Sequence, residues 1–376
     1  MHSHPPARLP TLTIVWHEAG NENYNDRYVS LRDCFNLEVL GPNRFMGKAF
    51  GRSADPSVSL LPSFFTGHWL TYLSLPVLWR IWRRPPSVLH IHQEPHSLMA
   101  FFACLFCRSK SVFLESSVIN SKGNLRGWNV LERWVYRRVD CVLPKNPEVA
   151  EVLVSRGCPR DKITAPIGNG VSRQSYAPMD RAEARRYMAA KFGVDVGGEP
   201  GRLCLGYAGR IWEAKGLRLL ADLKRQTNVD VWVCGEVRDQ ALRDDLLASG
   251  VQCFPALKKA DLRCFYSALD IFVLPSLPTP GWREQFGRVC AESIYCGTVA
   301  IGSRVGGIPM VVGEAQTFTA GSIDEAMHLV EALTDKGARD RCLAWQQGHI
   351  EKHFSWDAIA RQMQGFHTAQ CMDGVG

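Results

Sequence analysis

The chain has 376 residues, and 46% of them are hydrophobic, which is sufficient for two α/β domains with a core each. Its 13 cysteines are an odd number and, apart from Cys104 and Cys107, show no paired spacing. This pattern argues against a disulfide framework and indicates a reducing compartment. The formal net charge is +7, and the whole basic excess lies in residues 1–175.

Two segments bear on where the protein works. MHSHPPARLP at positions 1–10 lacks the apolar core of a cleavable signal peptide, so we expect a cytoplasmic protein. Cys104 and Cys107 lie in an apolar run, and no second pair of cysteines completes a zinc site. We therefore interpret both residues as buried thiols.

Strands and helices alternate along the first half of the chain. An amphipathic helix is expected at 25–35, after the first strand. The expected strands are 12–18, 37–42, 87–95, 111–116, 141–146 and 162–168. This alternation predicts a parallel sheet that binds its ligands at the carboxyl ends of the strands.

Three stretches of the first half combine Trp, Phe and Leu with Arg, namely 68–86, 101–113 and 131–139. Each is too short or too interrupted to span a bilayer. They are either interfacial amphipathic helices at an anionic membrane or core helices with a solvated basic edge. Nucleic acid is not favoured as a partner, because the chain contains no known binding motif.

The second half repeats the alternation after a turn-rich boundary at 168–180. A last amphipathic helix is expected at 355–370. The expected strands are 203–209, 229–236, 251–256, 270–276, 298–303 and 318–322.

Two glutamates eight positions apart mark the segment EQFGRVCAESIYCG (284–297). Prolines at 275, 278 and 280 keep the chain out of helix and sheet, so Glu284 is expected in a loop and Glu292 two turns into a helix. Eight helical residues span about 12 Å, comparable to a sugar–diphosphate–ribose unit. One carboxylate can thus bond sugar hydroxyls and the other ribose hydroxyls. The alternative is a pair of solvated surface acids.

The helix that carries Glu292 is expected to start near Gly287 and to end at Gly297. Free N–H groups near Phe286, Gly287 and Arg288 then point out of its N-terminus, an arrangement that suits a phosphate. Gly287 has no Cβ that would block the approach of a ligand to the backbone.

A second motif, LCLGYAGRIWEAKGL (203–217), places two cations after a short buried strand. Arg210 can neutralise a diphosphate bidentately, and Lys215 can do so as a point charge. The alternative is ordinary surface charge. The chain contains no GxGxxG and no GxxxxGK[ST] sequence, which argues against an oxidoreductase and against a P-loop ATPase.

Together, GRIWEAKG (209–216) and EQFGRVCAE (284–292) resemble the donor half of a retaining GT-B glycosyltransferase of glycosyltransferase family 4. The resemblance implies an α/β GT-B fold with two Rossmann-like domains whose parallel sheets face a central cleft. It predicts an acceptor-binding domain over 1–170 and a nucleotide-sugar-binding domain over 171–355. A helix in 356–376 is expected to return to the first domain.

The resemblance also assigns roles to residues of the second half. Arg210 and Lys215 would hold the pyrophosphate of the donor, Glu284 its sugar, and Glu292 its ribose. The predicted donor-binding residues are Arg210, Lys215, Glu284, Gln285, Phe286, Gly287, Arg288 and Glu292.

The first half departs from the commoner family pattern at two positions. A loop with one glycine, HEAGNENYNDRY (17–28), stands where many relatives have a Gly-rich loop, and Glu115 stands where many have a histidine. Strand ends still supply polar candidates, although a strand histidine can also be bonded in the core. The predicted acceptor-binding residues are His17, Gly20, His92, Glu94 and His96.

No DxD-type metal pair stands out, so we expect neither a catalytic metal nor a cofactor, and the cations and a helix dipole would stabilise the departing nucleoside diphosphate. The predicted catalytic residues are Glu284, Arg210, Lys215 and Glu115. The acceptor would be a glycan or a lipid-linked compound. Two other functions stay open: a nucleotide-sugar epimerase and an inactive membrane-associated scaffold.

Overall fold

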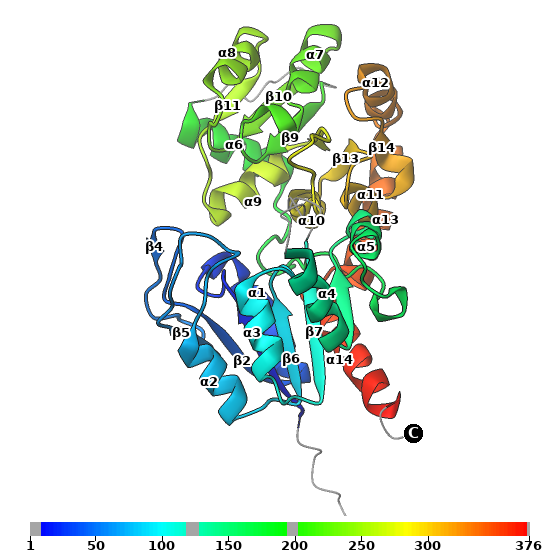
Figure 1. Cartoon of the computed structure of the whole chain (residues 1–376). Helices are drawn as coiled ribbons and strands as arrows, with labels where there is room; N and C mark the ends of the chain where they lie inside the picture. The colour runs from blue at the N-terminus through cyan, green and yellow to red at the C-terminus, as the bar shows by residue number, and fades with distance from the viewer. Residues whose placement is uncertain (1–8, 118–127, 194–201, 374–376) are drawn as a thin grey trace, which may run out of the picture. The chain divides into compact units, whose positions relative to one another are not determined.

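The fold is known from a computed structural model that describes residues 9–117, 128–193 and 202–373 (Figure 1). Most of the segment 1–10, interpreted above as lacking a signal sequence, lies outside the described residues. The chain forms two compact units. One comprises Met1–Gly168 with Trp356–Gly376, and the other comprises Asn169–Ser355.

The first unit contains a six-stranded sheet in the order β5-β2-β1-β6-β7-β8, and every neighbouring pair is parallel. A short antiparallel hairpin, β3 (Arg44–Phe45) with β4 (Lys48–Ala49), follows β2. The six strands are β1 (Thr11–Trp16), β2 (Asn36–Pro42), β5 (Val58–Leu61), β6 (Val88–His92), β7 (Ser111–Ser116) and β8 (Cys141–Pro144).

Helices cover both faces of this sheet (Figure 1). Alternate residues of a strand face opposite sides, so Val15 packs with α2 to α5, whereas Ile14 and Trp16 pack with α1 and α14. The helical elements are η1 (Glu22–Tyr24), α1 (Asn25–Cys34), α2 (Leu75–Arg83), α3 (Leu98–Phe106), α4 (Trp128–Arg138), α5 (Pro147–Ser155), η3 (Arg160–Lys162) and α14 (Trp356–Asp373).

The second unit repeats this architecture with a parallel sheet in the order β11-β10-β9-β12-β13-β14. The strands are β9 (Cys204–Ala208), β10 (Asp230–Cys234), β11 (Gln252–Phe254), β12 (Ile271–Leu274), β13 (Val299–Ser303) and β14 (Thr317–Phe318). The helical elements are α6 (Arg181–Phe192), η4 (Glu213–Lys215), α7 (Arg218–Gln226), α8 (Gln240–Ala248), α9 (Lys259–Ala268), α10 (Arg288–Tyr295), α11 (Ile308–Val312), η5 (Glu314–Gln316), α12 (Ile323–Ala332) and α13 (Lys336–His353).

Both sheets have the strand order of a doubly wound Rossmann-type fold, as the alternating pattern predicts. In each, the first three strands proceed outward from the centre and the last three proceed outward on the other side. Strand order therefore reverses between β1 and β6 in the first unit and between β9 and β12 in the second. Ligands of such sheets bind outside the carboxyl ends of the strands at this switch point.

Two expectations about strands were wrong. No strand forms at 162–168, where Ile163 makes only an isolated bridge with Val142, and Pro166 has no N–H with which to extend the pairing. Conversely, β5 was missed because Pro56 and Pro62 flank it closely, and such prolines usually mark loops.

The apolar basic stretches form helices that are partly core and partly surface. The stretch 101–113 is divided between the end of α3 and the start of β7. Both Cys104 and Cys107 are free thiols, and Cys104 is buried in the core as expected, whereas Cys107 is only half-buried. No helix in the described parts of the chain is long and apolar enough to cross a membrane.

Candidate functional site

The strongest candidate site lies at the switch point of the second unit. Lys215 ends the short helix η4 that follows β9, and Glu284 lies in the loop that follows the neighbouring strand β12. The Nζ atom of Lys215 lies 2.5 Å from Oε2 of Glu284. The hydroxyl of Ser276 donates a hydrogen bond to the same oxygen at 3.3 Å. Two residues 69 positions apart are thus joined at the sheet edge where a ligand is expected.

Gly216 explains why the two loops can approach so closely. It adopts a left-handed conformation with φ of 68°, and a Cβ at this position would lie 2.0 Å from the carbonyl oxygen of Pro275. Only glycine fits such a contact without moving the backbone. The glycine of the 209–216 motif therefore brings Lys215 against the end of β12.

Two tryptophans that the sequence analysis did not select complete this site. The Nζ atom of Lys215 lies 4.2 Å from the ring centroid of Trp282, and the Trp282 ring meets that of Trp212 edge-on at 5.5 Å. The guanidinium of Arg210 lies 5.5 Å from the centroid of Trp212. Trp212 stands inside the basic motif, so an aromatic residue between two predicted phosphate-binding cations was the available signal.

Glu292 occupies a different environment from Glu284. It lies on α10, which begins after Gly287 at φ of 83°, as the sequence predicts. Glu292 is only 3% exposed, accepts a hydrogen bond from the Tyr266 hydroxyl at 3.0 Å, and pairs with Nε of Arg288 at 3.0 Å. Glu284 is thus the more accessible of the two carboxylates.

Close packing fixes the start of the segment between the two glutamates. Phe286 is 2% exposed, and its ring packs on Phe354 at 5.1 Å between centroids. The carbonyl of Gln285 lies so close to Gly307 that a Cβ there would be 2.4 Å from it. This packing holds the segment 285–287 in one conformation before α10 begins.

At the switch point of the first unit the structure places a buried charged cluster around Glu115, at the end of β7. Arg27 donates to Oε2 of Glu115 at 2.6 Å, and Nε2 of His90 lies 2.9 Å from the same oxygen. Lys145 pairs with Oε1, and Nε2 of His92 lies 3.4 Å from that oxygen. Both carboxylate oxygens therefore have two partners each.

The electrostatics of this cluster follow from burial and from its cations. Burial alone would raise the pKa of Glu115, but the charges of Arg27, His92 and Lys145 hold it well below its usual range. Burial also lowers the pKa values of His90 and His92. Glu115 is consequently a weak base inside a closed network, and the structure gives it no exposed oxygen to offer a substrate.

The sequence analysis missed Arg27 and Lys145. Lys145 follows β8 directly, so it met the same criterion as the polar residues selected at other strand ends. Arg27 lies on α1, 88 residues from Glu115, and nothing in its local sequence marks it as a partner.

The predicted acceptor-binding residues gather around the ends of β1 and β6 but do not form one cluster. Nδ1 of His17 lies 3.0 Å from Oε1 of Gln93. Glu94 accepts hydrogen bonds from the Ser116 hydroxyl at 3.0 Å and the Ser117 N–H at 3.1 Å. Burial raises the pKa of Glu94 to about 7, against the lowering effect of these hydrogen bonds.

The two remaining acceptor candidates pack against aromatic side chains. His96 is 4% exposed and meets Trp69 edge-on at 5.3 Å. At Gly20, a Cβ would lie 2.5 Å from the ring of Phe50, so the loop after β1 is fixed by this close contact. Neither position offers an open polar surface by itself.

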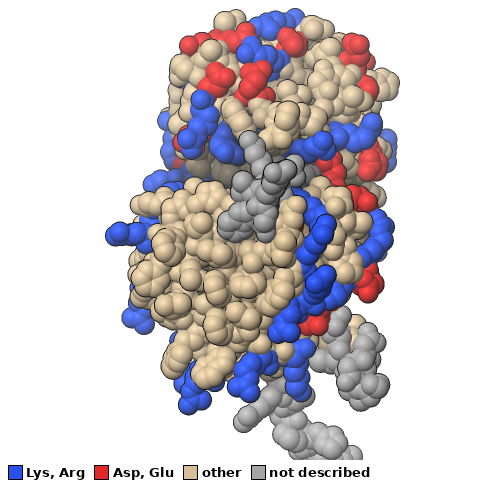
Figure 2. All heavy atoms as spheres, in the orientation of Figure 1, with Lys and Arg blue, Asp and Glu red and all other residues tan. Residues whose placement is uncertain are grey.

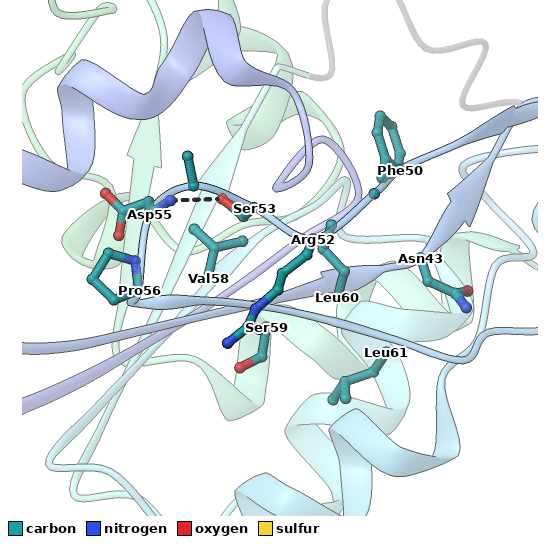
Figure 3. Close-up of a pocket in the computed structure, with 12 residues that line it drawn as sticks. Asn43, Phe50, Arg52, Ser53, Asp55, Pro56, Val58, Ser59, Leu60 and Leu61 are labelled. Atoms are coloured by element: carbon teal, nitrogen blue, oxygen red, sulfur yellow. Dashed lines mark hydrogen bonds between the residues drawn. The ribbon is translucent and has the colours of Figure 1, made fainter.

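A cavity of about 680 Å³ lies beside the edge strand β5 of the first unit (Figure 3). Its wall consists of the strand and of the loop that leads to it, where the Ser53 hydroxyl accepts a hydrogen bond from the Asp55 N–H at 3.2 Å. Its lining is Asn43, Phe50, Gly51, Arg52, Ser53, Ala54, Asp55, Pro56, Val58, Ser59, Leu60 and Leu61. None of the predicted acceptor-binding residues belongs to this lining.

Within the described ranges, no group of three or more His, Cys, Asp and Glu side chains is arranged to hold a metal ion. The second unit's site combines the carboxylate of Glu284, the hydroxyl of Ser276, the cations Lys215 and Arg210, and two indole rings.

Comparison with protein families gives matches over both units. The profile of the family described as Glycosyl transferases group 1 matches residues 202–335, and that of the Glycosyl transferase 4-like domain matches residues 47–170.

Curated relatives share part of the sequence. The D-inositol 3-phosphate glycosyltransferase of Pseudarthrobacter chlorophenolicus is 30% identical over 185 residues, which are 45% of this chain and 40% of that protein. The enzyme of the same name from Corynebacterium efficiens is 27% identical over 255 residues, which are 61% of this chain and 57% of that protein. The alignment thus spans between two fifths and three fifths of the length of these relatives.

Solved structures share the fold. Anabaena Alr3699/HepE in complex with UDP and glucose superposes with a TM-score of 0.69 at 15% identity, covering 96% of this chain and 99% of that one. A glycosyltransferase from Rickettsia africae superposes with a TM-score of 0.72 at 12% identity, covering 96% of this chain and 99% of that one.

Proposed function

Because the chain belongs to the group 1, family 4 type of glycosyltransferases with the GT-B fold, we propose that it transfers a sugar from a nucleotide sugar to a hydroxyl group of an acceptor. We assign donor binding to residues 171–355, which lie within the second unit, and acceptor binding to the first unit. The solved structures of similar fold include one solved with UDP and with UDP-glucose, which supports a nucleotide-sugar donor.

The observation that carries the proposal is the Lys215–Glu284 pair at the second unit's switch point. A diphosphate placed here would take Lys215 as its counter-ion, and Arg210 would add a second cation nearby. Glu284, released from Lys215, would then accept hydrogen bonds from sugar hydroxyls.

The remaining donor contacts follow from position. Glu292 would accept from ribose hydroxyls once Arg288 turns away from it, since Arg288 is its more exposed partner. The N–H groups of Gly287 and Arg288 begin α10 and suit the diphosphate. Gln285 and Phe286 would contribute backbone groups, because the Phe286 side chain is in the core.

In the transfer step, the bond between the anomeric carbon and the diphosphate oxygen breaks as the bond to the acceptor oxygen forms. Arg210 and Lys215 would stabilise the negative charge that develops on the departing diphosphate, and the proton of the acceptor hydroxyl would pass to a diphosphate oxygen while the acceptor oxygen stays in the new bond. We propose retention of the anomeric configuration on the strength of the family resemblance. We also propose that the reaction uses these cations in place of a metal ion and uses no cofactor.

For the acceptor we propose a glycan or a lipid-linked compound that binds near His17, Glu94 and His96 at the carboxyl ends of β1 and β6. We assign Glu115 a positioning role, since Arg27, Lys145 and two histidines hold it in place. We place the reaction in the cytoplasm, at the inner face of a membrane, because the described cysteines are free thiols and the first unit exposes apolar surface.

A thermal-shift screen of UDP, GDP and ADP and their common sugar conjugates, with and without EDTA, tests the donor site. A ligand of the native state raises the unfolding midpoint by mass action. One nucleoside diphosphate is expected to raise it equally with and without EDTA. Absence of a shift with every nucleotide would contradict the donor site, and turnover of labelled donor without any acceptor would instead indicate an epimerase.

A further inference from the structure

Helix α2 of the first unit is apolar on two faces. Its inner face buries Val77, Leu78 and Ile81 in the core beneath it. Its outer face exposes Leu75, Trp79 and Trp82, which are 55%, 64% and 47% exposed. The spacing of these three residues places them in one stripe along the helix. A helix that only completed a core would have polar residues on this stripe.

Neighbouring elements extend the exposed apolar stripe. Helix α3 packs beside α2 and exposes Leu105 and Phe106 at 45% and 42%. The loop before α2 exposes Phe65 at 70%, with φ of 51°, in the left-handed region that residues with a bulky side chain rarely adopt. We name the set of Phe65, Leu75, Trp79, Trp82, Leu105 and Phe106 the α2–α3 surface.

The charge around the α2–α3 surface has one sign. Between positions 62 and 112 the only charged residues are Arg80, Arg83, Arg84, Arg108, Lys110 and Glu94. Glu94 is hydrogen-bonded at the end of β6, and Arg80 is paired with Glu38. The other four cations are exposed. Figure 2 shows a broad uncharged area over the helices of this face, with Lys and Arg at its margins.

We propose that the α2–α3 surface docks on an anionic lipid bilayer. Trp, Phe and Leu would enter the interfacial layer, and the arginines and the lysine at the ends of α2 and α3 would meet lipid phosphates. The nine residues of α2 span about 13 Å, so the helix lies on the bilayer and does not cross it.

Charge separates this occupant from a second copy of the chain. A symmetric dimer through the same surface would bring Arg83, Arg84, Arg108 and Lys110 of both copies together, while Glu94, the acidic residue of this stretch, is already hydrogen-bonded at the end of β6. An anionic bilayer supplies both the apolar layer and the opposite charge. This proposal rests on the proposed function in one respect only: the bilayer surface is where the enzyme would meet a lipid-linked acceptor.

Vesicle co-sedimentation tests the proposal, with phosphatidylcholine vesicles compared with phosphatidylcholine–phosphatidylglycerol vesicles. The wild-type chain is expected to sediment with the anionic vesicles and to be released by high salt. The double variant W79Q/W82Q and, separately, R83Q/R84Q should each reduce binding about tenfold or more. W345Q is the matched control, because Trp345 is 53% exposed but lies on the second unit.

Thermal unfolding of each variant checks that it folds. Binding that is unchanged in W79Q/W82Q, or equal with and without phosphatidylglycerol, would overturn the proposal. If the wild-type chain dimerises with rising concentration and W79Q/W82Q does not, the α2–α3 surface binds a second copy of the chain, and the membrane proposal is overturned. The K215A variant should still bind vesicles, so a failure of the donor site and a failure of membrane binding are distinguishable.

Discussion

The two units share one strand order but treat the charges at their switch points in opposite ways. In the second unit, Lys215 and Glu284 form a single pair in a half-open site beside two tryptophans. In the first, Glu115 is 1% exposed, and four basic side chains surround it. A ligand can take the place of one member of a single ion pair. In contrast, a ligand could reach Glu115 only if the network of charges around it were broken.

The difference teaches that strand ends alone do not identify a catalytic group. Glu115 lies at the end of the buried strand β7, and Glu284 lies in the loop after the buried strand β12, so the carboxyl end of a strand brings each near a switch point. What separates them is how many oppositely charged neighbours the fold brings to each. Removal of Glu115 should therefore mainly lower stability, whereas removal of Glu284 should mainly lower activity.

The largest expected effect is on stability, from E115A. This change would leave the buried Arg27 and Lys145 without their counter-ion, so we expect the free energy of unfolding of the first unit to fall by about 3–5 kcal/mol. Chemical denaturation monitored by circular dichroism measures it. E284A is the matched comparison and should cost less, because the side chains of Lys215 and Glu284 keep 11% and 16% exposure, against 0% for Glu115. Equal losses of the free energy of unfolding in E115A and E284A would show that the two carboxylates contribute equally to stability, against this comparison.

The next largest effect is on transfer, from the same E284A variant. Loss of the sugar contact should lower the transfer rate by roughly 100- to 1000-fold. Affinity for the nucleoside diphosphate should stay equal or rise slightly, because Lys215 no longer has a competing carboxylate. Calorimetric titration with the diphosphate found in the screen measures this, and a large loss of affinity would remove Glu284 from the sugar position.

K215A should act on binding in the reverse sense. Loss of a charged contact to the diphosphate is expected to weaken nucleotide binding by about 10- to 100-fold. K336A serves as a control, since Lys336 is an exposed lysine of α13 paired only with Asp340 along its helix. If K215A and K336A bind the nucleotide alike, Lys215 lies outside the donor site.

W282A should have a smaller effect through Lys215. The indole ring lies against Nζ of Lys215, and losing this cation–π contact should weaken nucleotide binding by a factor of about 3 to 10. W282F should keep most of the affinity, because a benzene ring retains the contact. An equal loss in W282F and W282A would point to a packing role for the indole.

The smallest expected effect is on the pH dependence of stability, through the carboxyl group of Glu94. Burial raises the folded-state pKa of this carboxyl to about 7, so the folded protein holds a proton that the unfolded chain releases at lower pH. Its contribution to stability is present below the unfolded pKa and is lost as pH rises through about 7. E94Q should flatten this part of the melting-temperature profile. A profile identical to that of the wild type would show that another group titrates there.

Much of the fold follows from local pattern. The strands β1, β2, β6, β7, β8 and β9 to β13 lie within or close to their expected ranges, because each is a short apolar run bounded by turn residues. Local pattern does not predict the short edge strand β5. It also does not predict the contacts between residues that are far apart in the sequence. Trp282 meets Lys215, and Arg27 meets Glu115, only because the sheet brings distant strand ends together.

The candidate sites also contain residues that the sequence predicts and residues that it does not. The Lys215 and Glu284 motifs were recognisable because their spacing within each segment is characteristic, although their roles stay predictions. The closed state of Glu115 could not be predicted, since three of its partners, Arg27, His90 and Lys145, come from three other elements. Both acids are glutamates near the carboxyl end of a buried strand, and their charged neighbours differ.

Helix α14 gives the chain an order of assembly. Its Ile359 and Met363 complete the core of the first unit beside Leu12 and Ile14, which are synthesised more than three hundred positions earlier. This face of the first sheet is therefore packed against α1 but not yet against α14 while the ribosome makes the whole second unit. The second unit is continuous in sequence and can close as soon as it emerges. On the ribosome, the part of the protein that is translated first is thus the part that is finished last.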